Sequence, residues 1–244
     1  MCFLESQKLK ISQLFDEMMV DLPPPNPDLP PRRAVSSYLR RLDRYWRGGW
    51  SWQWPLVIAG PKDGGKTQFL YQLIASSLLS FNKPWLVFYS DFTGNFRPER
   101  IQSILGQRLR GGQHQWQLGR LDKLTMNRRI SFLDVIKWNW RQPNLALWVI
   151  AGWHHVDSSL PFKTWLNLLA EFSRRKQAGV ILTIQGSVEE LLPLVPWSMI
   201  PFFLYLSPVR HGLHRLRVWQ NGAQSKIYDR KLTLNGYFRE VRQW

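Results

Sequence analysis

Continuous apolar runs of strand length alternate with segments of helical periodicity through the middle of the chain. Four runs have the length and unbroken apolar character of strands buried on both faces: 56–59, 85–90, 145–150 and 180–185. The helical segments between them include 131–140 and 162–176. Strands that alternate with helices predict an α/β fold, with a mostly parallel central sheet and flanking helices on both faces.

The last third of the chain changes from this pattern to strands that follow one another directly. Three segments have strand character: 202–206, 213–220 and 225–234. The dipeptides that follow them favour tight turns: His211-Gly212, Asn221-Gly222 and Asn235-Gly236. Neighbouring strands joined by such turns predict a C-terminal antiparallel β extension.

The pattern divides the chain into three parts. Residues 1–21 hold a predicted amphipathic helix, whose apolar stripe comprises Ile11, Leu14, Phe15, Met18 and Met19. Residues 22–34 are too rich in proline for a helix or an inner strand and predict an extended linker. Residues 35–244 form the core, which begins with a helical segment over 35–43. Because the stripe must be buried, the N-terminal helix packs either on this core or on a partner subunit.

Tryptophans gather before the first core strand and within one predicted helix. Four of them crowd the first region: Trp46, Trp50, Trp52 and Trp54. Tryptophans at such short spacing favour a strand face packed on the core over a platform for stacking bases. Trp138 and Trp140 point to different faces of their helix, so we expect at least one of them to pack in the core.

The net charge of the chain indicates a polyanionic partner. The 244 residues include 33 Lys and Arg against 17 Asp and Glu, a formal net charge of +16. Nucleic acid fits this charge better than a membrane, because the chain has no lipid-anchor motif and no basic amphipathic terminus. The strongest basic stretch, 108–129, contains a single acid, Asp122. It is either a solvated connection or a nucleic-acid contact.

The sequence gives no sign of export or of membrane insertion. The longest apolar runs, 145–153 and 199–206, are shorter than the roughly 20 residues that span a bilayer. Glu5 and Lys8 interrupt the apolar character of a signal peptide. Cys2 is the only cysteine, which excludes an intrachain disulfide. We expect an intracellular protein, in the nucleoid or cytoplasm of a prokaryote or the nucleus of a eukaryote.

The most specific pattern follows the first core strand. The segment Gly60-Pro61-Lys62-Asp63-Gly64-Gly65-Lys66-Thr67 has the spacing Gly-x4-Gly-Lys-Thr and leads into a helix with Gln68. In a phosphate-binding loop of this kind, Gly65 lets the backbone close on phosphate oxygens, and the first helical N–H groups point at the anion. Lys66 reaches the β- and γ-phosphates and Thr67 holds Mg²⁺. A chance glycine turn is the alternative, but chance seldom supplies the flanking strand and helix.

Several segments together are similar to one known family. Gly94-Asn95-Phe96-Arg97-Pro98-Glu99-Arg100-Ile101 is similar to the signature after that family's second core strand. Three more segments match in order and spacing: Leu42-Asp43 with Gly48-Gly49, Gly65-Lys66-Thr67-Gln68, and Thr183-Ile184-Gln185. Over residues 36–238 the chain resembles the RadA branch of the RecA superfamily, the archaeal and eukaryotic strand-exchange recombinases and their non-catalytic paralogues. The resemblance implies a RecA-like P-loop ATPase core with ATP and Mg²⁺ as cofactors.

The resemblance also implies roles for individual residues. Residues 60–68 would surround the phosphates and the metal ion, as the loop pattern already predicts. Arg100 would stack on the adenine, and Gln185 would sense the γ-phosphate. The family's assembly motif, Phe-x-x-Ala, has only a partial counterpart in Phe15-Asp16-Glu17-Met18. Filament formation is therefore doubtful, and pairing with a recombinase or another paralogue is the expected assembly.

Two acids that the resemblance leads us to expect are absent. The family carries a water-activating glutamate two residues after the aspartate of its second core strand, where this chain has Thr93. The family's third strand ends in an aspartate that holds Mg²⁺ through water, where Ala151 stands here. Losing a positioned general base typically costs about 10²–10⁴-fold in rate. Asp91 and Asp63 are the nearby acids that could substitute, and we expect nucleotide binding with little or no hydrolysis.

The family's two DNA-binding loops correspond to 153–159 and 186–197, and neither contains a Lys or Arg. The pair His154-His155, without a nearby Cys, is a poor set of metal ligands. We therefore expect single-stranded DNA on other basic surfaces, to which Arg40-Arg41 and His214 add charge. The candidate DNA-binding residues are Arg108, Arg110, Arg120, Lys123, Arg128, Arg129, Arg210, Arg215 and Arg217.

Three functional hypotheses remain open. The first is an accessory recombinase paralogue that binds ATP and single-stranded DNA and assists a true recombinase in homologous recombination and DNA repair. The second is an active DNA-stimulated ATPase or recombinase with displaced acids. The third is an ATP-binding signalling or structural subunit akin to the KaiC relatives. The segment 96–100 favours the recombinase branch over the third.

Overall fold

The computed structural model describes most of the chain. The described residues are 12–13, 15–17, 34–51, 54–80, 85–107, 121–125, 131–155, 160–210, 213–232 and 238–240. The predicted proline-rich linker, the turns His211-Gly212 and Asn235-Gly236, and most of the basic stretch 108–129 lie outside them, apart from Ala34 of the linker and five residues of the stretch.

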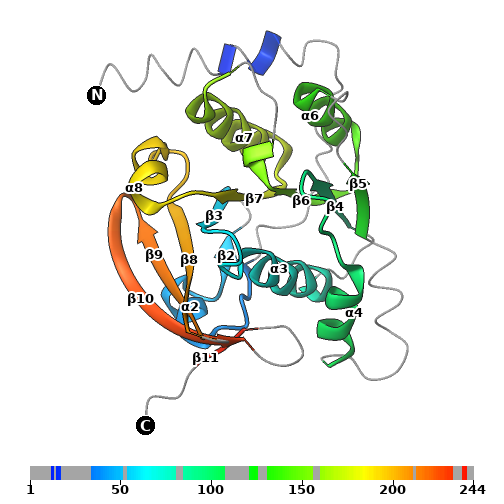
Figure 1. Ribbon diagram of the computed structural model, residues 1–244. Helices are drawn as coiled ribbons and strands as arrows, with labels where there is room; N and C mark the ends of the chain where they lie inside the picture. The colour runs from blue at the N-terminus through cyan, green and yellow to red at the C-terminus, as the bar shows by residue number, and fades with distance from the viewer. Residues whose placement is uncertain are drawn as a thin grey trace.

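A mixed sheet runs through the described part of the chain (Figure 1). Its parallel strands, in order across the sheet, are β8 (Phe202–Arg210), β3 (Leu56–Gly60), β7 (Gly179–Gln185), β6 (Leu145–Ala151), β4 (Leu86–Asp91) and β5 (Leu121–Thr125). Beyond β8 the sheet continues with antiparallel strands: β9 (Leu213–Gln220), β10 (Ala223–Leu232) and β11 (Phe238–Glu240). The predicted α/β class, its parallel sheet and its antiparallel extension are confirmed.

Helices cover both faces of the parallel strands. In Figure 1, α3 (Lys66–Ser80) and α4 (Pro98–Gly106) lie below the sheet, whereas α6 (Phe132–Arg141) and α7 (Phe162–Lys176) lie above it. Successive side chains of a strand point to opposite faces, and β3 follows this rule. Leu56 and Ile58 belong to the apolar cluster on the α3 face, and Val57 and Ala59 belong to the cluster on the α6 and α7 face. Both faces of β3 are therefore apolar, as expected of a strand covered on both sides.

The remaining described elements are short. They are β1 (Ala34–Val35), α2 (Arg40–Tyr45), β2 (Trp50–Ser51), η1 (Trp153–His155), α8 (Val188–Leu191) and η2 (Leu192–Leu194). The tight turn predicted at Asn221-Gly222 joins β9 to β10, with φ of 50° and 86°. No helix in the described part of the chain has both the length and the apolar character to cross a bilayer.

The helix predicted over 35–43 begins later than expected. Residues Ala34–Val35 pair with β2, and α2 starts only at Arg40. The reason is the Asp43 carboxylate, which accepts hydrogen bonds of 2.6 Å from the hydroxyls of Ser36 and Ser37 and from the Ser37 backbone N–H. Such side-chain to backbone bonds compete with a helix and hold a turn instead.

The basic stretch 108–129 contains a strand that the sequence did not indicate. Leu121–Thr125 forms β5 at the edge of the sheet and pairs in parallel with β4. An edge strand has one partner strand only, and this segment, which includes Asp122 and Lys123, lacks the continuous apolar run of the inner strands. Of the two interpretations left open for this stretch, a solvated connection therefore does not describe these five residues, and the nucleic-acid contact stays a prediction.

The predicted core packing holds for some of the tryptophans, and Trp52 lies outside the described residues. Trp46 and Trp50 are buried before β3, whereas Trp54 is 40% exposed. Along α6, Trp140 is buried and Trp138 is 38% exposed. Residues two apart in sequence point to different faces of a helix, and the structure places Trp138 and Trp140 accordingly.

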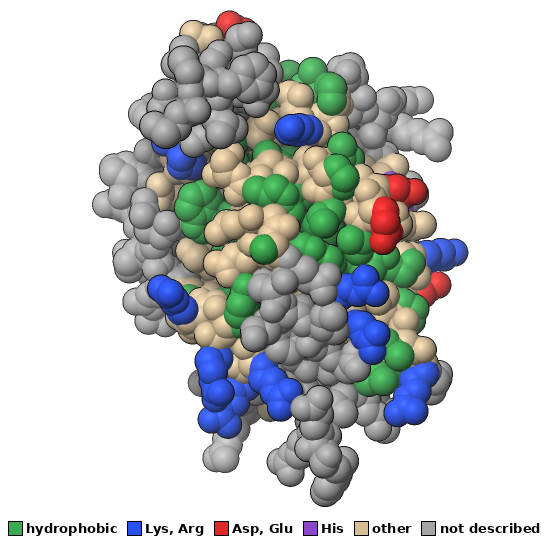
Figure 2. All heavy atoms as spheres, turned by 90° about the vertical axis from the view of Figure 1, so that its left-hand side faces the viewer, with side chains coloured by type: hydrophobic (Ala, Val, Ile, Leu, Met, Phe, Trp, Pro, Cys, Tyr) green, Lys and Arg blue, Asp and Glu red, His purple; other side chains and the backbone are tan. Residues whose placement is uncertain are grey.

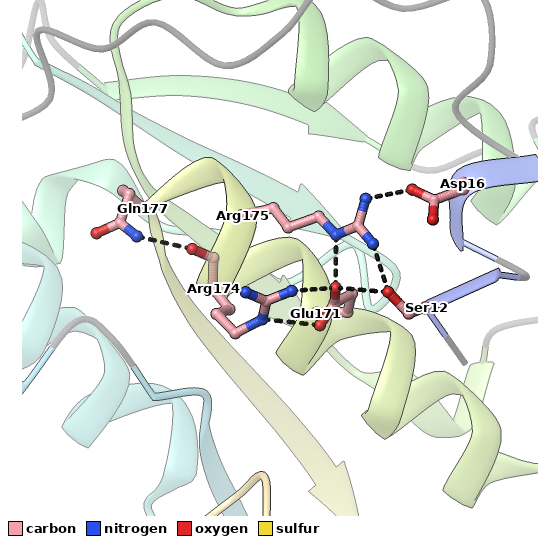
Figure 3. A network of polar contacts seen from close by, with 6 residues as sticks. All are labelled: Ser12, Asp16, Glu171, Arg174, Arg175 and Gln177. Atoms are coloured by element: carbon pink, nitrogen blue, oxygen red, sulfur yellow. Dashed lines mark hydrogen bonds and ion pairs between the residues drawn. The ribbon is translucent and has the colours of Figure 1, made fainter. Parts of the chain in front are cut away.

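The described N-terminal residues pack on the chain's own core, on the α6 and α7 face. Phe15 is fully buried there, edge-on to Trp140 with ring centroids 5.4 Å apart. Arg175 lies over the Phe15 ring, forms an ion pair with Asp16 and donates to Ser12 Oγ at 2.6 Å (Figure 3). Of the two predicted locations for the apolar stripe, Phe15 takes the one on its own domain.

Candidate nucleotide site and basic surface

The predicted phosphate loop joins the end of β3 to the start of α3. Gly64 N–H donates to the Pro61 carbonyl at 3.1 Å, which closes the turn, and Phe69 N–H donates to the Gly65 carbonyl at 3.0 Å as the helix begins. Gly65 has φ of 89°, a left-handed conformation that glycine adopts without strain. The loop therefore ends at the N-terminus of a 15-residue helix, where free N–H groups and the helix dipole favour an anion.

Close packing against β8 explains two of the loop's glycines. A Cβ atom on Gly60 would lie 2.0 Å from the Leu206 carbonyl oxygen, and one on Gly64 would lie 2.7 Å from the same atom. Real Cβ atoms do not approach backbone oxygen so closely. The loop thus rests directly on the backbone of the neighbouring strand.

Lys66 folds back over the loop. Its Nζ donates to the carbonyls of Gly60 at 2.9 Å and Pro61 at 2.6 Å. Burial lowers the pKa of Lys66 to about 8, against a smaller raising effect of the Asp63 carboxylate. The ammonium group is held at the loop by neutral carbonyls, which a phosphate group can replace with a stronger charge-assisted interaction.

The next two residues of α3 are Thr67 and Gln68. Thr67 is exposed in the first turn, so its hydroxyl can reach a metal ion beside bound phosphates. Mg²⁺ accepts few protein ligands and completes its coordination shell with water and phosphate oxygens. The chain's residues at this position therefore fit Mg²⁺. The Gln68 Oε1 atom is buried and has no hydrogen-bond partner among the described residues.

The register of the sheet brings Gln185 to the loop. Gln185, the last residue of β7, pairs with Gly60, the last residue of β3, and its side chain is exposed. Gly186 N–H donates to the Gly60 carbonyl at 3.3 Å. Both residues lie at the carboxyl edge of the parallel strands, the edge at which α/β folds bind ligands.

Arg100 lies on the same face of the sheet as α3. It is exposed on α4, which packs on α3 through Ile101, Ile104 and Leu105. Tyr71 of α3 ties this region together, because its hydroxyl accepts from Arg97 N–H at 2.7 Å and donates to the Asn95 carbonyl at 3.2 Å. Burial raises the pKa of Tyr71 to about 12, so the hydroxyl keeps its proton.

Asp91 organises the turn after β4. Its Oδ1 accepts from Thr93 N–H at 3.0 Å, Thr93 Oγ1 at 2.9 Å and Gly94 N–H at 2.9 Å, and its Oδ2 accepts from Phe96 N–H at 3.2 Å. The side chain is 1% exposed. These bonds give Asp91 a structural role, since they hold the segment that leads into α4.

The two positions that lack the expected acids adjoin this edge. Ala151 ends β6, is buried, and pairs with Asp91 on one side and Thr183 on the other. Gly152 N–H donates to Thr183 Oγ1 at 3.0 Å. Within the described residues, no group of three His, Cys, Asp or Glu side chains is arranged to hold a metal ion. His154 is exposed after Trp153.

Comparison with known proteins identifies the architecture. No protein-family model matches the sequence, and no curated protein matches it. Among solved structures, the crystal structure of the RadB recombinase matches with a TM-score of 0.67 and 21% sequence identity, over 85% of this chain and 100% of that chain. The chain shares its fold with that structure. The predicted RecA-like architecture is confirmed, and the likeness does not distinguish the RadA branch within it.

On this recombinase fold, arginines project from the hairpin of β8 and β9. Arg210 is exposed, and Arg215 and Arg217 are partly exposed on the outer face of β9. The Arg217 guanidinium lies over the Tyr205 ring, 6.0 Å from its centroid. These three predicted DNA-binding residues therefore share one surface. The side chains of the other six candidates lie outside the described part of the chain: Arg108, Arg110, Arg120, Lys123, Arg128 and Arg129.

His214 does not belong to this exposed surface, contrary to the prediction. It lies on the inner face of β9, is 8% exposed, and its Nδ1 is 3.2 Å from the Gly64 carbonyl oxygen of the phosphate loop. Burial lowers the pKa of His214, against a raising effect of the Gly64 hydrogen bond, and so favours the neutral ring. The alternation of β9 explains this, since residues 214 and 215 must face opposite sides of the sheet.

A second basic group, on α2, was only half identified from the sequence. Arg40 and Arg41 were noted there, Arg44 is exposed with them on the helix, and Arg47 is exposed just after it. The acid within the helix, Asp43, accepts hydrogen bonds from Ser36 and Ser37. Figure 2 shows Lys and Arg side chains gathered along the lower part of the face at the β10 end of the sheet.

The segment that corresponds to the family's second DNA-binding loop is folded here. Ser187 caps α8 by accepting from Glu190 N–H, and the Glu190 carboxylate accepts from Ser187 N–H in return. Glu189 and Glu190 are exposed on this short helix. The surface of α8 is therefore acidic, which disfavours a phosphate backbone at that position.

Proposed function

We propose that this protein binds ATP with Mg²⁺, hydrolyses it slowly or not at all, and binds single-stranded DNA through basic surfaces. In this role it assists a recombinase of similar fold in homologous recombination and DNA repair. The observation that carries the proposal is a complete phosphate loop on a recombinase fold in which Thr93 and Ala151 replace the two catalytic acids.

The nucleotide part of the proposal rests on the loop geometry. Lys66 contacts the carbonyls of Gly60 and Pro61, the loop opens a long helix, and Gln185 ends the adjacent strand. Each of these groups has a role toward the phosphates, and Arg100 is assigned to the adenine by resemblance. None of these binding roles requires a carboxylate.

The slow hydrolysis follows from the neighbouring strand ends. Thr93 cannot accept a proton from water at neutral pH as a carboxylate does. Asp91, the nearest buried acid, already accepts four hydrogen bonds from its own turn. These contacts favour binding without efficient turnover over the alternative of an active ATPase with displaced acids.

The DNA part rests on the positions of the arginines. The β8–β9 hairpin presents Arg210, Arg215 and Arg217. On the surface of α2 are three more arginines, and Arg47 is exposed just after that helix. In contrast, α8 presents Glu189 and Glu190 where the family's second DNA loop would stand. We therefore assign single-stranded DNA to the hairpin and α2, away from α8.

ATP binding by a Lys66→Ala variant tests the nucleotide part. A hydrogen bond to a charged group contributes about 1.5–3 kcal/mol, so the variant should lose about ten- to a hundredfold in affinity. Lys163→Ala, which removes an exposed lysine of α7, is the matched control and should bind as the wild type does. Full affinity in Lys66→Ala would contradict the assignment of the phosphate site.

Salt dependence tests the DNA part. Each phosphate contact that is lost reduces the slope of log affinity against log salt by about 0.7 for single strands. The Arg210→Ala, Arg215→Ala double variant should therefore bind oligonucleotides more weakly and with a shallower slope. Arg141→Ala, Lys163→Ala carries the same charge change on α6 and α7 and serves as control. Equal slopes in the two double variants would remove the hairpin from the DNA surface.

A further inference from the structure

His214 is a polar side chain buried between the sheet and the phosphate loop. It belongs to the inner face of β9, with the buried Leu216 and Val218, whereas Arg215 and Arg217 alternate with it on the outer face. Its Nδ1 lies 3.2 Å from the Gly64 carbonyl oxygen. Because a carbonyl oxygen can only accept, this contact is a hydrogen bond in which Nδ1 carries the proton.

The geometry of one peptide bond links this contact to the anion site. In a planar trans peptide, the carbonyl of one residue and the N–H of the next point in opposite directions. Holding the Gly64 carbonyl toward β9 therefore turns the Gly65 N–H away from β9. The peptide lies between two glycines, and Gly65 has φ of 89°, so the backbone itself offers little resistance to a flip of this peptide.

Two other carbonyls of the loop are held by Lys66. Its ammonium group binds the Gly60 and Pro61 oxygens, and Pro61 also accepts from Gly64 N–H. If the Gly64 carbonyl turned toward the anion, it would place a partial negative charge against phosphate and remove one N–H donor. The contact from β9 opposes that rotation.

We propose that His214 is a positioning residue for the phosphate loop, which holds the Gly64–Gly65 peptide so that the Gly65 N–H faces the anion. This inference rests on the proposed binding of nucleotide. It gives β9 two roles, since the inner face of the strand supports the loop and its outer face carries arginines assigned to DNA.

A pair of variants separates this role from simple packing. His214→Leu places an apolar side chain of similar bulk in the core and removes the N–H donor. His214→Asn has a smaller, polar side chain but retains an N–H near the position of Nδ1. We expect His214→Leu to weaken ATP binding about tenfold, the effect of one lost hydrogen bond to a charged group, and His214→Asn to bind within about twofold of the wild type. A packing role predicts the reverse order.

The Gly65 amide gives a second readout, in ¹⁵N-labelled protein. Addition of ATP should shift this resonance in the wild type and in His214→Asn and leave it almost unchanged in His214→Leu. If His214→Leu does not fold, His214→Met removes the donor with a more adaptable side chain. Equal affinities and equal Gly65 shifts in the Leu or Met variant and in His214→Asn would overturn the inference.

The Lys66→Ala variant keeps the two proposals apart. If Lys66→Ala loses ATP binding while His214→Leu retains it, the phosphate site stands and the role of His214 is rejected. If Lys66→Ala binds with full affinity, the phosphate site itself is rejected, and the role of His214 with it. Loss of affinity in both variants, with recovery in His214→Asn, is the result that we expect.

Discussion

The end of β3 and the ends of β4 and β6 lie along the same edge of one sheet but differ in their chemistry. After β3 lie the residues of the proposed phosphate loop, from the glycines packed on Leu206 to the half-buried Lys66. After β4 and β6, Thr93 and Ala151 stand where the resemblance implies acids. In our proposal, one part of the edge holds phosphate, and the other lacks the groups that would activate water.

This difference shows that binding and hydrolysis make separate demands on the fold. Binding uses backbone N–H groups, a helix terminus and one lysine, which the local sequence determines. Hydrolysis needs a base placed against water, and a positioned base contributes about 10²–10⁴-fold in rate. A chain can lose the second set of groups and keep the first, because they belong to different strands.

Restoring the missing base should have the largest effect. Thr93→Glu places a carboxylate at the position after β4, where Thr93 is partly exposed. We expect ATP turnover to rise by about 10²-fold, the lower end of the contribution of a general base. Thr93→Gln, which has the same shape without the charge, should stay at the level of the wild type in the same steady-state assay.

A rise in Thr93→Gln equal to that in Thr93→Glu would mean that shape, and not a base, limits the reaction. No rise in either variant, with ATP binding intact, would show that the missing acid at Ala151 or the geometry of the edge is limiting.

Removing Asp91 should affect stability more than chemistry. Its carboxylate accepts four hydrogen bonds in a buried turn, and Asp91→Ala leaves these donors unpaired. We expect the free energy of unfolding to fall by about 2 kcal/mol, measured by urea denaturation. Asp91→Asn retains one acceptor oxygen and should lose less. Unchanged stability together with loss of ATP turnover in Asp91→Asn would instead make Asp91 the substitute acid.

A smaller effect is expected from pH. The pKa of Lys66 is lowered by burial to about 8, so the free protein carries the charged form below that pH and loses it as the pH rises. Phosphate favours the charged form. ATP affinity should therefore be full near pH 7 and fall by about tenfold at pH 9, where a group with a pKa of 8 is about one-tenth protonated.

Lys66→Arg provides the control, because arginine remains protonated over this range. Its affinity for ATP, whatever its value, should change little between pH 7 and pH 9 in the same calorimetric titration. A wild-type affinity that is equally flat would remove the charge of Lys66 from the binding of phosphate.

The sequence predicted the parts of this edge that depend only on residues close together in the chain. The strand, glycine turn and helix from Leu56 to Ser80 are contiguous, so spacing alone identified them. The turn at Asn221-Gly222 was equally local. The order of the strands in the sheet was not predicted, because periodicity does not show which strands pair.

The features that were missed depend on contacts between distant residues. His214 was counted with the basic hairpin because periodicity could not show which face of β9 meets the phosphate loop. The late start of α2 depends on the side chain of Asp43 reaching back to Ser36. β5 was missed because an edge strand has no continuous apolar run. Each case required knowledge of a neighbour that the linear pattern does not supply.

The measurement that tests the central claim most directly is ATP turnover by the purified protein, with and without saturating single-stranded DNA, in a preparation already shown to bind ATP. Our account predicts stoichiometric ATP binding with turnover at or near background in both conditions. DNA-stimulated turnover within the ordinary range of enzymes, on the order of 1 s⁻¹ or faster, would contradict it and would mean that another group on this edge activates the water.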